Sequence, residues 1–431
     1  MVRETRSGRA LDSVSGLIAE AMAGKVSRRE IARRGAALGI AAPMLAAMFR
    51  FAPNAAAQDA TPAAAAPSGD PIKIGAVYGL TGGMSSIDVP GSQGALLAAA
   101  EINANGGLLG RPVELIVEDG RTDVTATTNA TRKLIDEDQA VALMGLNDTT
   151  FALAVGPIAQ EAGRVYLTCG ATGPIIPETG DFVFMLPFGD NVQSAVAAEY
   201  AKEQGWKTCG LLVDDQLDFT LFLAEYFKDR FDDEDIGGQI LAEIPFSSGD
   251  TDFSAQMTDF AALDPQPDFW FFSAAPNEAG TTVRQARDAG LTQPILSGDG
   301  FDTPLLVELG GDAANGVVFA THQGVYEDTP IGDAFRAAYE AEYGTPPETV
   351  FAALGYDGLR LLANAIERAG SDDPAAIRDA LAETQGFEGV TGTVSYEGDS
   401  RIPTKGCALI EIVDGEYTFL RNVTPEIVPP A

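Results

Sequence analysis

The segment IKIGAVYGLTGGMSSIDVPGSQGALLAAAEINANGGLLGRPVELIVE, residues 72–118, decides the fold class of this chain. It begins with Ile72–Tyr78, a short apolar run rich in β-branched residues, which predicts a buried strand. Apolar spacing predicts a helix over Gly91–Ala104, and Asn105-Gly106-Gly107 is typical of a helix end. A second apolar run, Pro112–Glu118, predicts another strand. Two buried strands joined by a helix form the unit of a parallel sheet.

The same alternation continues along most of the chain. Further strands are predicted at Ala140–Leu146, Val165–Cys169, Thr208–Asp214, Gln239–Ile244, Asp268–Ser273 and Pro294–Ser297. Further helices are predicted at Thr125–Glu137, Leu153–Ala162, Gln193–Glu203, Leu221–Phe231, Phe253–Leu263, Glu278–Ala289, Pro330–Tyr343, Val350–Ala369 and Pro374–Glu383. Short strands follow at Gly392–Tyr396, Cys407–Val413 and Glu416–Leu420. The pattern predicts an α/β fold with parallel sheets, and an approximate two-fold repetition of the module divides near Pro187–Asn191.

Residues 1–57 predict an export signal. Basic residues at 27–33 precede the apolar run Gly35–Phe49, and Ala55-Ala56-Ala57 is a small-residue cleavage pattern. The Arg28-Arg29 pair resembles a twin-arginine signal. The run of about 15 apolar residues is shorter than the roughly 20 that a spanning helix needs, and Pro43 also argues against the alternative of an uncleaved anchor. We therefore expect an exported protein, periplasmic or on the extracytoplasmic face of the cell membrane.

Residues 58–70, QDATPAAAAPSGD, are rich in Ala and Pro and predict a flexible or extended tether. The folded part is expected to begin at Pro71.

The charge of the chain argues against two classes of partner. It contains 62 Asp and Glu against 28 Lys and Arg, a net charge of −34. Nucleic acids and anionic lipid surfaces attract basic patches, so neither is expected as a partner. Solubility or a salty medium explains such a charge without any site.

Cysteine and histidine are too scarce for most catalytic and metal sites. The cysteines are Cys169, Cys209 and Cys407, none in a CxxC pair, and the only histidine is His322. A triad would have to use His322, and no G-x-S-x-G motif accompanies it. No phosphate-binding GxxxxGK[ST] motif is present either. The sequence therefore predicts no metal, no cofactor and no enzyme.

Polar residues follow several predicted strands, where ligands bind to open α/β sheets. Gly145–Thr150 and Cys169–Gly173 each place threonines and main-chain N–H groups after a strand, chemistry that suits a carboxylate or an amide oxygen. Asp299 stands between two glycines after another strand and could hold an ammonium group. Phe219 could form an apolar wall. The alternatives are that Thr149 and Thr172 cap helices, that Asp299 belongs to a turn and that Phe219 packs in the core.

Six segments in a fixed order resemble a known family. They are IKIGAVYGLTGG (72–83), AAEINANGGLLGRPVELIVEDGRTD (99–123), GATGP (170–174), DFWFFSAAPNEAGTTVRQARDAGL (268–291), GDAANGV (311–317) and GYDGLRLLANAIERAGSDDPAAIRDAL (355–381). Together they resemble the type I periplasmic binding proteins, in the leucine/isoleucine/valine-binding branch of the receptors of ABC importers. The resemblance extends over about residues 72–420.

The resemblance implies two Rossmann-like lobes with parallel sheets, joined by three crossovers. Lobe 1 would comprise residues 71–189 plus 322–391, and lobe 2 residues 190–321 plus 392–425. The crossovers are expected near Pro187–Asp190, Ala320–Gln323 and Thr391–Val394. Such proteins are not catalysts: the ligand bridges the lobes, and a membrane permease reads the closed form.

The resemblance also implies the ligand-binding residues. By position, hydroxyls and main-chain N–H groups at Thr149, Thr150, Gly170, Ala171 and Thr172 would hold the α-carboxylate of an amino acid. Phe219, Ala275 and Asp299 would complete the site from lobe 2. Asp299 would take the α-ammonium and is one methylene shorter than the glutamate of the family. The family often has an aromatic residue of lobe 1 near Ile87/Asp88, which is missing here, and Ser273–Asn277 is less aromatic than usual; both predict a roomier pocket.

The expected partners are an amino acid, branched-chain or otherwise aliphatic, and an ABC permease, with the receptor itself a monomer. Three other functions stay open at this point. A short amide or urea could be the ligand on the same scaffold, or the protein could sense a ligand for a separate signalling partner. A secreted hydrolase is disfavoured by the lack of a nucleophile–base pair.

Overall fold

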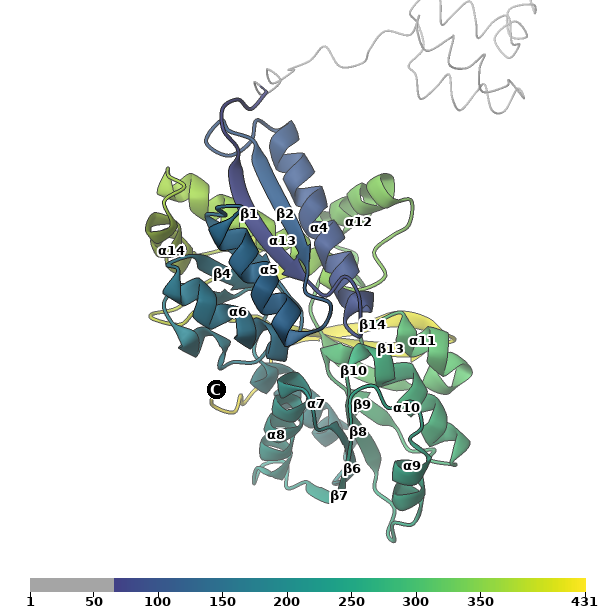
Figure 1. Cartoon of the computed structure of the whole chain (residues 1–431). Coiled ribbons are helices and arrows are strands. Elements are labelled where there is room, and N and C mark those ends of the chain that lie inside the picture. The colour runs from purple at the N-terminus through teal and green to yellow at the C-terminus, as the bar shows by residue number, and fades with distance from the viewer. Residues whose placement is uncertain (1–65) are drawn as a thin grey trace, which may run out of the picture. The chain divides into compact units, whose positions relative to one another are not determined.

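The computed structural model describes residues 66–431, so the predicted export signal lies outside the described residues, as does the tether up to residue 65. From Ala66 on, the chain forms two large sheets, each covered by its own helices, and one two-stranded hairpin (Figure 1). We call the first sheet with its helices lobe 1 and the second sheet with its helices lobe 2. Among residues 66–431 no helix combines the length and the apolar character that crossing a bilayer requires.

The sheet of lobe 1 is parallel, with the strand order β2-β1-β3-β4-β5. Its strands are β1 (Ile72–Tyr78), β2 (Val113–Asp119), β3 (Ala142–Gly145), β4 (Val165–Thr168) and β5 (Val183–Met185). The connecting helices are α4 (Ser85–Ala104), α5 (Val124–Asp136), α6 (Thr149–Glu161) and the short 3₁₀ turn η1 (Ile176–Thr179). Strands β1, β3, β4 and β5 are almost wholly buried, as continuous apolar runs in a covered parallel sheet should be.

The sheet of lobe 2 has the order β14-β13-β10-β9-β8-β6-β7. Its pairs are parallel from β10 to β7, and β13 pairs antiparallel with both β10 and β14. Its strands are β6 (Thr208–Asp214), β7 (Gln239–Phe246), β8 (Phe269–Ser273), β9 (Ile295–Ser297), β10 (Val317–Thr321), β13 (Cys407–Val413) and β14 (Glu416–Val423). The helices are α7 (Asp190–Gln204), α8 (Asp218–Asp232), α9 (Ser254–Ala261), α10 (Pro276–Asp288) and α11 (Leu305–Gly310), with the 3₁₀ turns η2 (Asp299–Phe301) and η3 (Gly311–Ala314).

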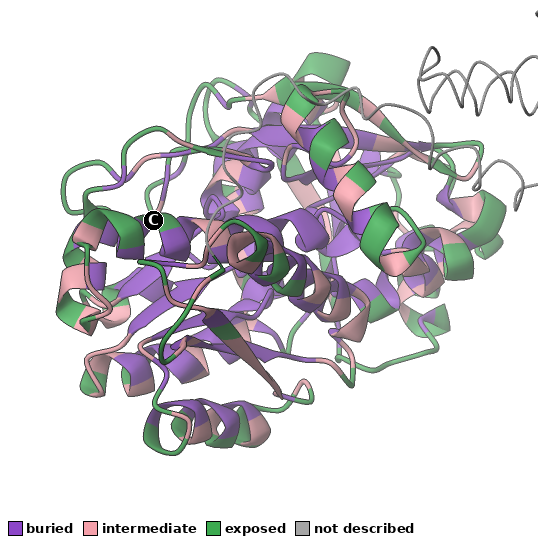
Figure 2. Cartoon of the chain, turned by 90° about the horizontal axis from the view of Figure 1, so that it is seen from above, coloured by how far each residue is buried: buried purple, intermediate pink, exposed green. Residues whose placement is uncertain are grey.

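After β10 the chain returns to lobe 1 and adds α12 (Pro330–Tyr343), α13 (Phe351–Ala369), α14 (Pro374–Ala382) and the hairpin β11 (Phe387–Gly389) and β12 (Gly392–Val394). In Figure 2 the strands lie buried between helices whose outer faces are exposed. This arrangement agrees with the predicted α/β class and with the two-lobed fold.

Helix α4 begins at Ser85 and not at Gly91 as predicted, and close contact with α13 accounts for the glycines inside it. A Cβ atom on Gly94 would lie 1.8 Å from the carbonyl oxygen of Ala352, and one on Gly355 would lie 1.8 Å from that of Gly91. These glycines let the two helix backbones touch, so residues that suggest a helix break in the sequence are packing residues here. Pro90 lies inside the same helix.

Three connections join the lobes. The first leads from β5 into α7, and the second follows β10. On the third, Val394 and Tyr396 still pack in the apolar core of lobe 1, and the chain enters the sheet of lobe 2 at Cys407. That connection therefore lies C-terminal to the expected 391–394, because the β11–β12 hairpin belongs to the first core. The three cysteines are buried and free, as Cys169, Cys209 and Cys407 form no disulfide.

Candidate functional site

The carboxyl ends of the parallel strands of the two sheets face each other, and hydrogen bonds join the loops there. The amide of Asp218 donates to Thr150 Oγ1 at 2.9 Å, and Thr303 Oγ1 donates to Ser86 Oγ at 3.0 Å. The amide of Val350 donates to Asp302 Oδ1 at 3.3 Å. The apolar core of lobe 1 also receives Leu217 and Ala275 from lobe 2. The lobes are thus in contact over the loops that the sequence selects for a ligand.

The loop between β3 and α6 places Asp148 and Thr149 in different roles. Asp148 is the N-cap of α6, and its Oδ1 accepts a hydrogen bond from the amide of Thr150 at 2.9 Å. Thr149 Oγ1 accepts from the amide of Gly173 at 3.0 Å. Thr149 is therefore not the cap that its alternative interpretation requires. Its hydroxyl instead ties this loop to the next one, after β4.

The loop after β4 carries Gly170, Ala171 and Thr172. The amide of Gly170 donates to the carbonyl of Leu146 at 3.2 Å, and that of Ala171 donates to Thr168 Oγ1 at 3.2 Å. Within residues 66–431 the amide of Thr172 donates no hydrogen bond. Two of the three predicted main-chain donors are thus engaged inside lobe 1, and the third is available for a ligand.

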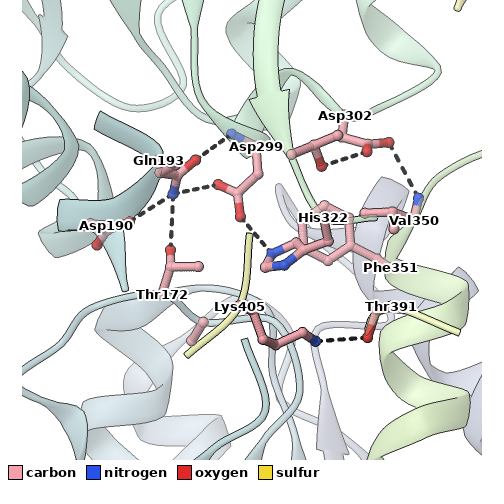
Figure 3. A network of polar contacts seen from close by, with 12 residues as sticks. Thr172, Asp190, Gln193, Asp299, Asp302, His322, Val350, Phe351, Thr391 and Lys405 are labelled. Carbon is pink, nitrogen blue, oxygen red and sulfur yellow. Dashed lines mark hydrogen bonds and ion pairs between the residues drawn. The ribbon is translucent and has the colours of Figure 1, made fainter. Parts of the chain in front are cut away.

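Asp299 lies in a hydrogen-bonded cluster that reaches from lobe 2 to Thr172 of lobe 1 (Figure 3). It follows β9 in the turn η2 and is 2 % exposed. Gln193 binds it twice: Gln193 Nε2 donates to Asp299 Oδ1 at 3.1 Å, and the amide of Asp299 donates to Gln193 Oε1 at 2.8 Å. Gln193 Nε2 also lies 3.4 Å from Thr172 Oγ1. One side chain therefore links the predicted carboxylate and ammonium sites.

His322 contacts the second carboxylate oxygen of Asp299. Its Nε2 lies 3.2 Å from Asp299 Oδ2, and its Nδ1 is buried without a partner among the described residues. The ring stacks on Phe188 with centroids 4.1 Å apart, and Phe351 meets it edge-on at 6.4 Å. Burial lowers the pKa of His322 below its usual 6.5, so the imidazole is neutral at neutral pH.

Phe219 and Ala275 line the lobe 2 side. Phe219, in the first turn of α8, is buried and packs against Gly300 beside Asp299, because a Cβ on Gly300 would lie 3.0 Å from the Phe219 ring. Ala275 is the N-cap residue of α10 and is 3 % exposed. The core-packing alternative for Phe219 therefore holds in this structure, and the same ring borders the turn that carries Asp299.

The interface between the lobes is rich in buried carboxyl groups. Burial raises the pKa of Asp88, Asp148 and Asp302 from 3.8 to about 7. Burial also raises the pKa of Asp190, whose Oδ1 accepts a hydrogen bond from Gln193 Nε2 at 2.9 Å. The interface favours positive groups and hydrogen-bond donors.

A buried lysine, Lys405, lies on the third connection between the lobes. Lys405 Nζ donates to Thr391 Oγ1 at 2.9 Å and to the carbonyl of Leu186 at 3.4 Å. Burial lowers its pKa to about 8. Phe188, His322 and Lys405 come from the three connections, and Figure 3 draws His322 and Lys405 near one another.

Four important residues were missed as site residues in the sequence: Asn147, Asp148, Gln193 and His322. The signal for Asn147 and Asp148 was their place beside Thr149 on a strand-end loop. Gln193 and Asp299 are 106 residues apart in the sequence, so no local pattern predicts their contact. Among residues 66–431, no three His, Cys, Asp or Glu side chains gather in a manner that could hold a metal ion.

Comparison with known proteins gives a consistent picture. A model of the family "Periplasmic binding protein" matches residues 71–416. The chain is 28 % identical to Leu/Ile/Val-binding protein homolog 3 of Brucella melitensis, over 81 % of this chain and 93 % of that protein.

Two solved structures extend the comparison. The branched-chain amino acid transporter substrate-binding protein LivJ of Streptococcus pneumoniae, solved with isoleucine, is 30 % identical with a TM-score of 0.77, covering 83 % of this chain and all of LivJ. A solute-binding protein of an ABC transporter from Rhodopseudomonas palustris, solved with 3,4-dihydroxybenzoic acid, is 25 % identical with a TM-score of 0.75, covering 84 % and 99 %. The likeness in sequence and in fold extends over both lobes, and this chain belongs to the type I periplasmic binding proteins, in the leucine/isoleucine/valine-binding family of solute receptors.

Proposed function

We propose that this protein is an exported receptor of an ABC importer, which binds an α-amino acid between its lobes and delivers it to a membrane permease. One observation carries the proposal: the cluster Thr172–Gln193–Asp299 joins hydrogen-bond donors of lobe 1 to a buried carboxylate of lobe 2. An α-amino acid has the complementary pair of groups, a carboxylate and an ammonium, on one carbon atom.

The carboxylate of the ligand would bind to the hydroxyls of Thr149 and Thr172 and to the amide of Thr172, which has no acceptor in residues 66–431. The ammonium would bind to Asp299 and replace the donors that Gln193 and His322 now supply. Charge-assisted hydrogen bonds of this kind are among the strongest in proteins. A few convergent polar groups of this kind are typical of a small-molecule site.

Closure of the lobes would couple binding to recognition by the permease. The contacts between Thr150 and Asp218 and between Asp302 and Val350 exist only when the lobes are together. A ligand that touches both lobes stabilises the closed form by its differential contacts. The permease can then distinguish loaded from unloaded receptor by shape.

The relatives named for leucine, isoleucine and valine support an amino acid as the ligand, and a branched-chain or other aliphatic side chain is the starting expectation. The relative solved with 3,4-dihydroxybenzoic acid makes aromatic carboxylates a necessary comparison. Amides and urea are the neutral comparison.

A calorimetric titration of the purified protein against the twenty amino acids, acetamide, urea and benzoate tests the proposal. We expect at least one amino acid to bind, and we expect its decarboxylated amine and its deaminated acid to bind far more weakly. Binding of benzoate, acetamide or urea alone would refute the amino-acid assignment and would remove Asp299 from an ammonium-binding role.

A further inference from the structure

Two buried oxygen atoms on the β3–α6 loop have no hydrogen-bond partner in the part of the chain described, Asn147 Oδ1 and Asp148 Oδ2. Asn147 is 6 % exposed and Asp148 is 3 % exposed. The fold already uses the other polar atom of each side chain, because Asp148 Oδ1 caps α6 and Asn147 Nδ2 donates to Asp88 Oδ1 at 2.7 Å. Buried polar atoms without partners are uncommon in native proteins, so these two require an explanation.

Both oxygens lie next to the loop to which we assign the carboxylate of the ligand. A Cβ atom on Gly170 would lie 2.4 Å from Asn147 Oδ1, so this oxygen points at the backbone of that loop. Asp148 directly precedes Thr149, whose hydroxyl accepts a hydrogen bond from Gly173. A ligand whose carboxylate binds at this loop could extend its side chain toward Asn147 and Asp148.

The charge around these oxygens has one sign. Asp88 and Asp148 are both buried, and the charged neighbours that act on Asp148 are Asp88 and Asp218, which are also acidic. Burial raises the pKa of Asp88 and of Asp148 to about 7, as expected for carboxyl groups without a cation. An aliphatic side chain would leave both oxygens unsatisfied, whereas a positive nitrogen would donate to both and neutralise the charge.

The position of Asp218 relates this group of acids to closure. Asp218 begins α8 of lobe 2, and its amide donates to Thr150 Oγ1 of lobe 1. Closure therefore brings one more carboxylate of lobe 2 toward Asp148 and Asp88. A cation between them would stabilise the closed form in particular.

We propose that Asn147 and Asp148 form a subsite for a positively charged nitrogen at the end of the ligand's side chain, so that the protein takes a basic amino acid in preference to an aliphatic one. The inference rests on the proposed function, because it assumes that the α-carboxylate and the α-ammonium bind at Thr172 and Asp299. The inferred ligand is basic, whereas the names of the relatives suggest an aliphatic one. The two oxygens without hydrogen-bond partners are the basis for its charged side chain.

Calorimetric titration of the full-length protein with matched pairs tests the inference. Lysine is compared with norleucine, which lacks only the terminal ammonium group, and arginine with citrulline, which has nearly the same shape but no charge on its side chain. Ornithine and 2,4-diaminobutyrate measure the reach of the subsite. We expect each cationic member to bind at least about tenfold more tightly than its neutral partner, the scale of one charge-assisted hydrogen bond.

The variant Asp148→Asn assigns the effect to the residue. Asparagine caps helices as well as aspartate does, so α6 should be preserved. We expect the preference for lysine over norleucine to fall by at least about tenfold, because the variant lacks the charge that lysine would neutralise. Asp123→Asn is the control, because Asp123 also caps a helix, α5, with its side chain but is exposed.

The outcomes separate this inference from the proposed function. If leucine and norleucine bind as tightly as lysine, ornithine and arginine, the subsite is refuted and the amino-acid receptor stands. If no amino acid binds, both fall. If the cationic preference persists in Asp148→Asn, the assignment to Asp148 is refuted. The comparison of lysine with norleucine on the unaltered protein tests the subsite even if the variant fails to fold.

Discussion

Replacing Asp148 by asparagine should make the unliganded protein more stable at neutral and alkaline pH. Asp148 is 3 % exposed, and its Oδ2 has no partner within residues 66–431. The substitution retains the oxygen that caps α6 through the amide of Thr150. It exchanges one unpartnered atom for another of nearly the same size and removes the charge.

The magnitude follows from the pKa of the carboxyl group. Burial raises the pKa of Asp148 from 3.8 to about 7, so between these values the folded protein binds more protons than the unfolded chain. Stability therefore falls as the pH rises through this window, and the loss is complete above about pH 7. At about 1.4 kcal/mol per pH unit the ceiling is roughly 4 kcal/mol. Relaxation around a charged group lowers this, and we expect a gain on the order of 1–3 kcal/mol from the substitution.

Urea unfolding at pH 8 and near pH 4.5, without ligand, measures the effect. The variant should exceed the unaltered protein in stability at pH 8, and the difference should shrink toward zero near pH 4.5. Asp123→Asn, at the exposed cap of α5, should show no such gain at pH 8. A variant that is no more stable than the unaltered protein at pH 8, or a gain that does not depend on pH, would refute the reasoning.

Four further predictions concern the site, the fold and export. Asp299→Asn should weaken amino-acid binding by about 10- to 100-fold in calorimetry, whereas Asp214→Asn, a buried strand-end acid bonded only within lobe 2, should leave affinity unchanged. Since burial lowers the pKa of His322 below its usual 6.5, the ring becomes charged only at acidic pH, where it competes with the ligand's ammonium for Asp299. Calorimetry should show that amino-acid affinity falls as the pH is lowered below 6.5 in the unaltered protein and stays level in His322→Gln. Gly94→Ala should lower the free energy of unfolding by about 1–3 kcal/mol or more, because its Cβ would lie 1.8 Å from a carbonyl oxygen of α13. Amino-terminal sequencing of exported protein should begin near Gln58.

The strands were predictable because each is a continuous apolar run buried in a parallel sheet, and the predicted and observed strands at 72–78 and 208–214 coincide. Two helix starts were predicted several residues too late, at Gly91 where α4 begins at Ser85 and at Leu153 where α6 begins at Thr149, whereas the starts at Pro330 and Pro374 were predicted correctly. The first helical turns contain glycine, proline or polar residues, whose helical state is decided by tertiary contact. Such tertiary contacts cannot be predicted from the local sequence.

The loops that form the candidate site were predictable from the sequence, but the hydrogen bonds between their side chains were not. The rule that ligands lie at the carboxyl ends of strands selected the loops of Thr149, Thr172 and Asp299, and the structure brings these loops together. It could not reveal that Gln193 and His322 occupy both oxygens of Asp299, because these contacts join residues 106 and 23 positions apart. It also assigned the possible cap to Thr149, whereas the side chain of Asp148 caps α6.

The two oxygens of Asp148 have different roles: one serves the fold, and we assign the other to the ligand. Oδ1 caps α6, and any residue with one side-chain acceptor, such as asparagine or serine, would serve the fold as well. Oδ2 and the negative charge bring the fold no hydrogen bond in residues 66–431, and they lower its stability above about pH 4. A carboxylate that destabilises the unliganded protein stabilises it once a cation arrives, and it adds that energy to the closed form in which Asp218 approaches from the other lobe. The binding energy for a basic amino acid would thus come partly from relief of a repulsion that is built into the unliganded receptor.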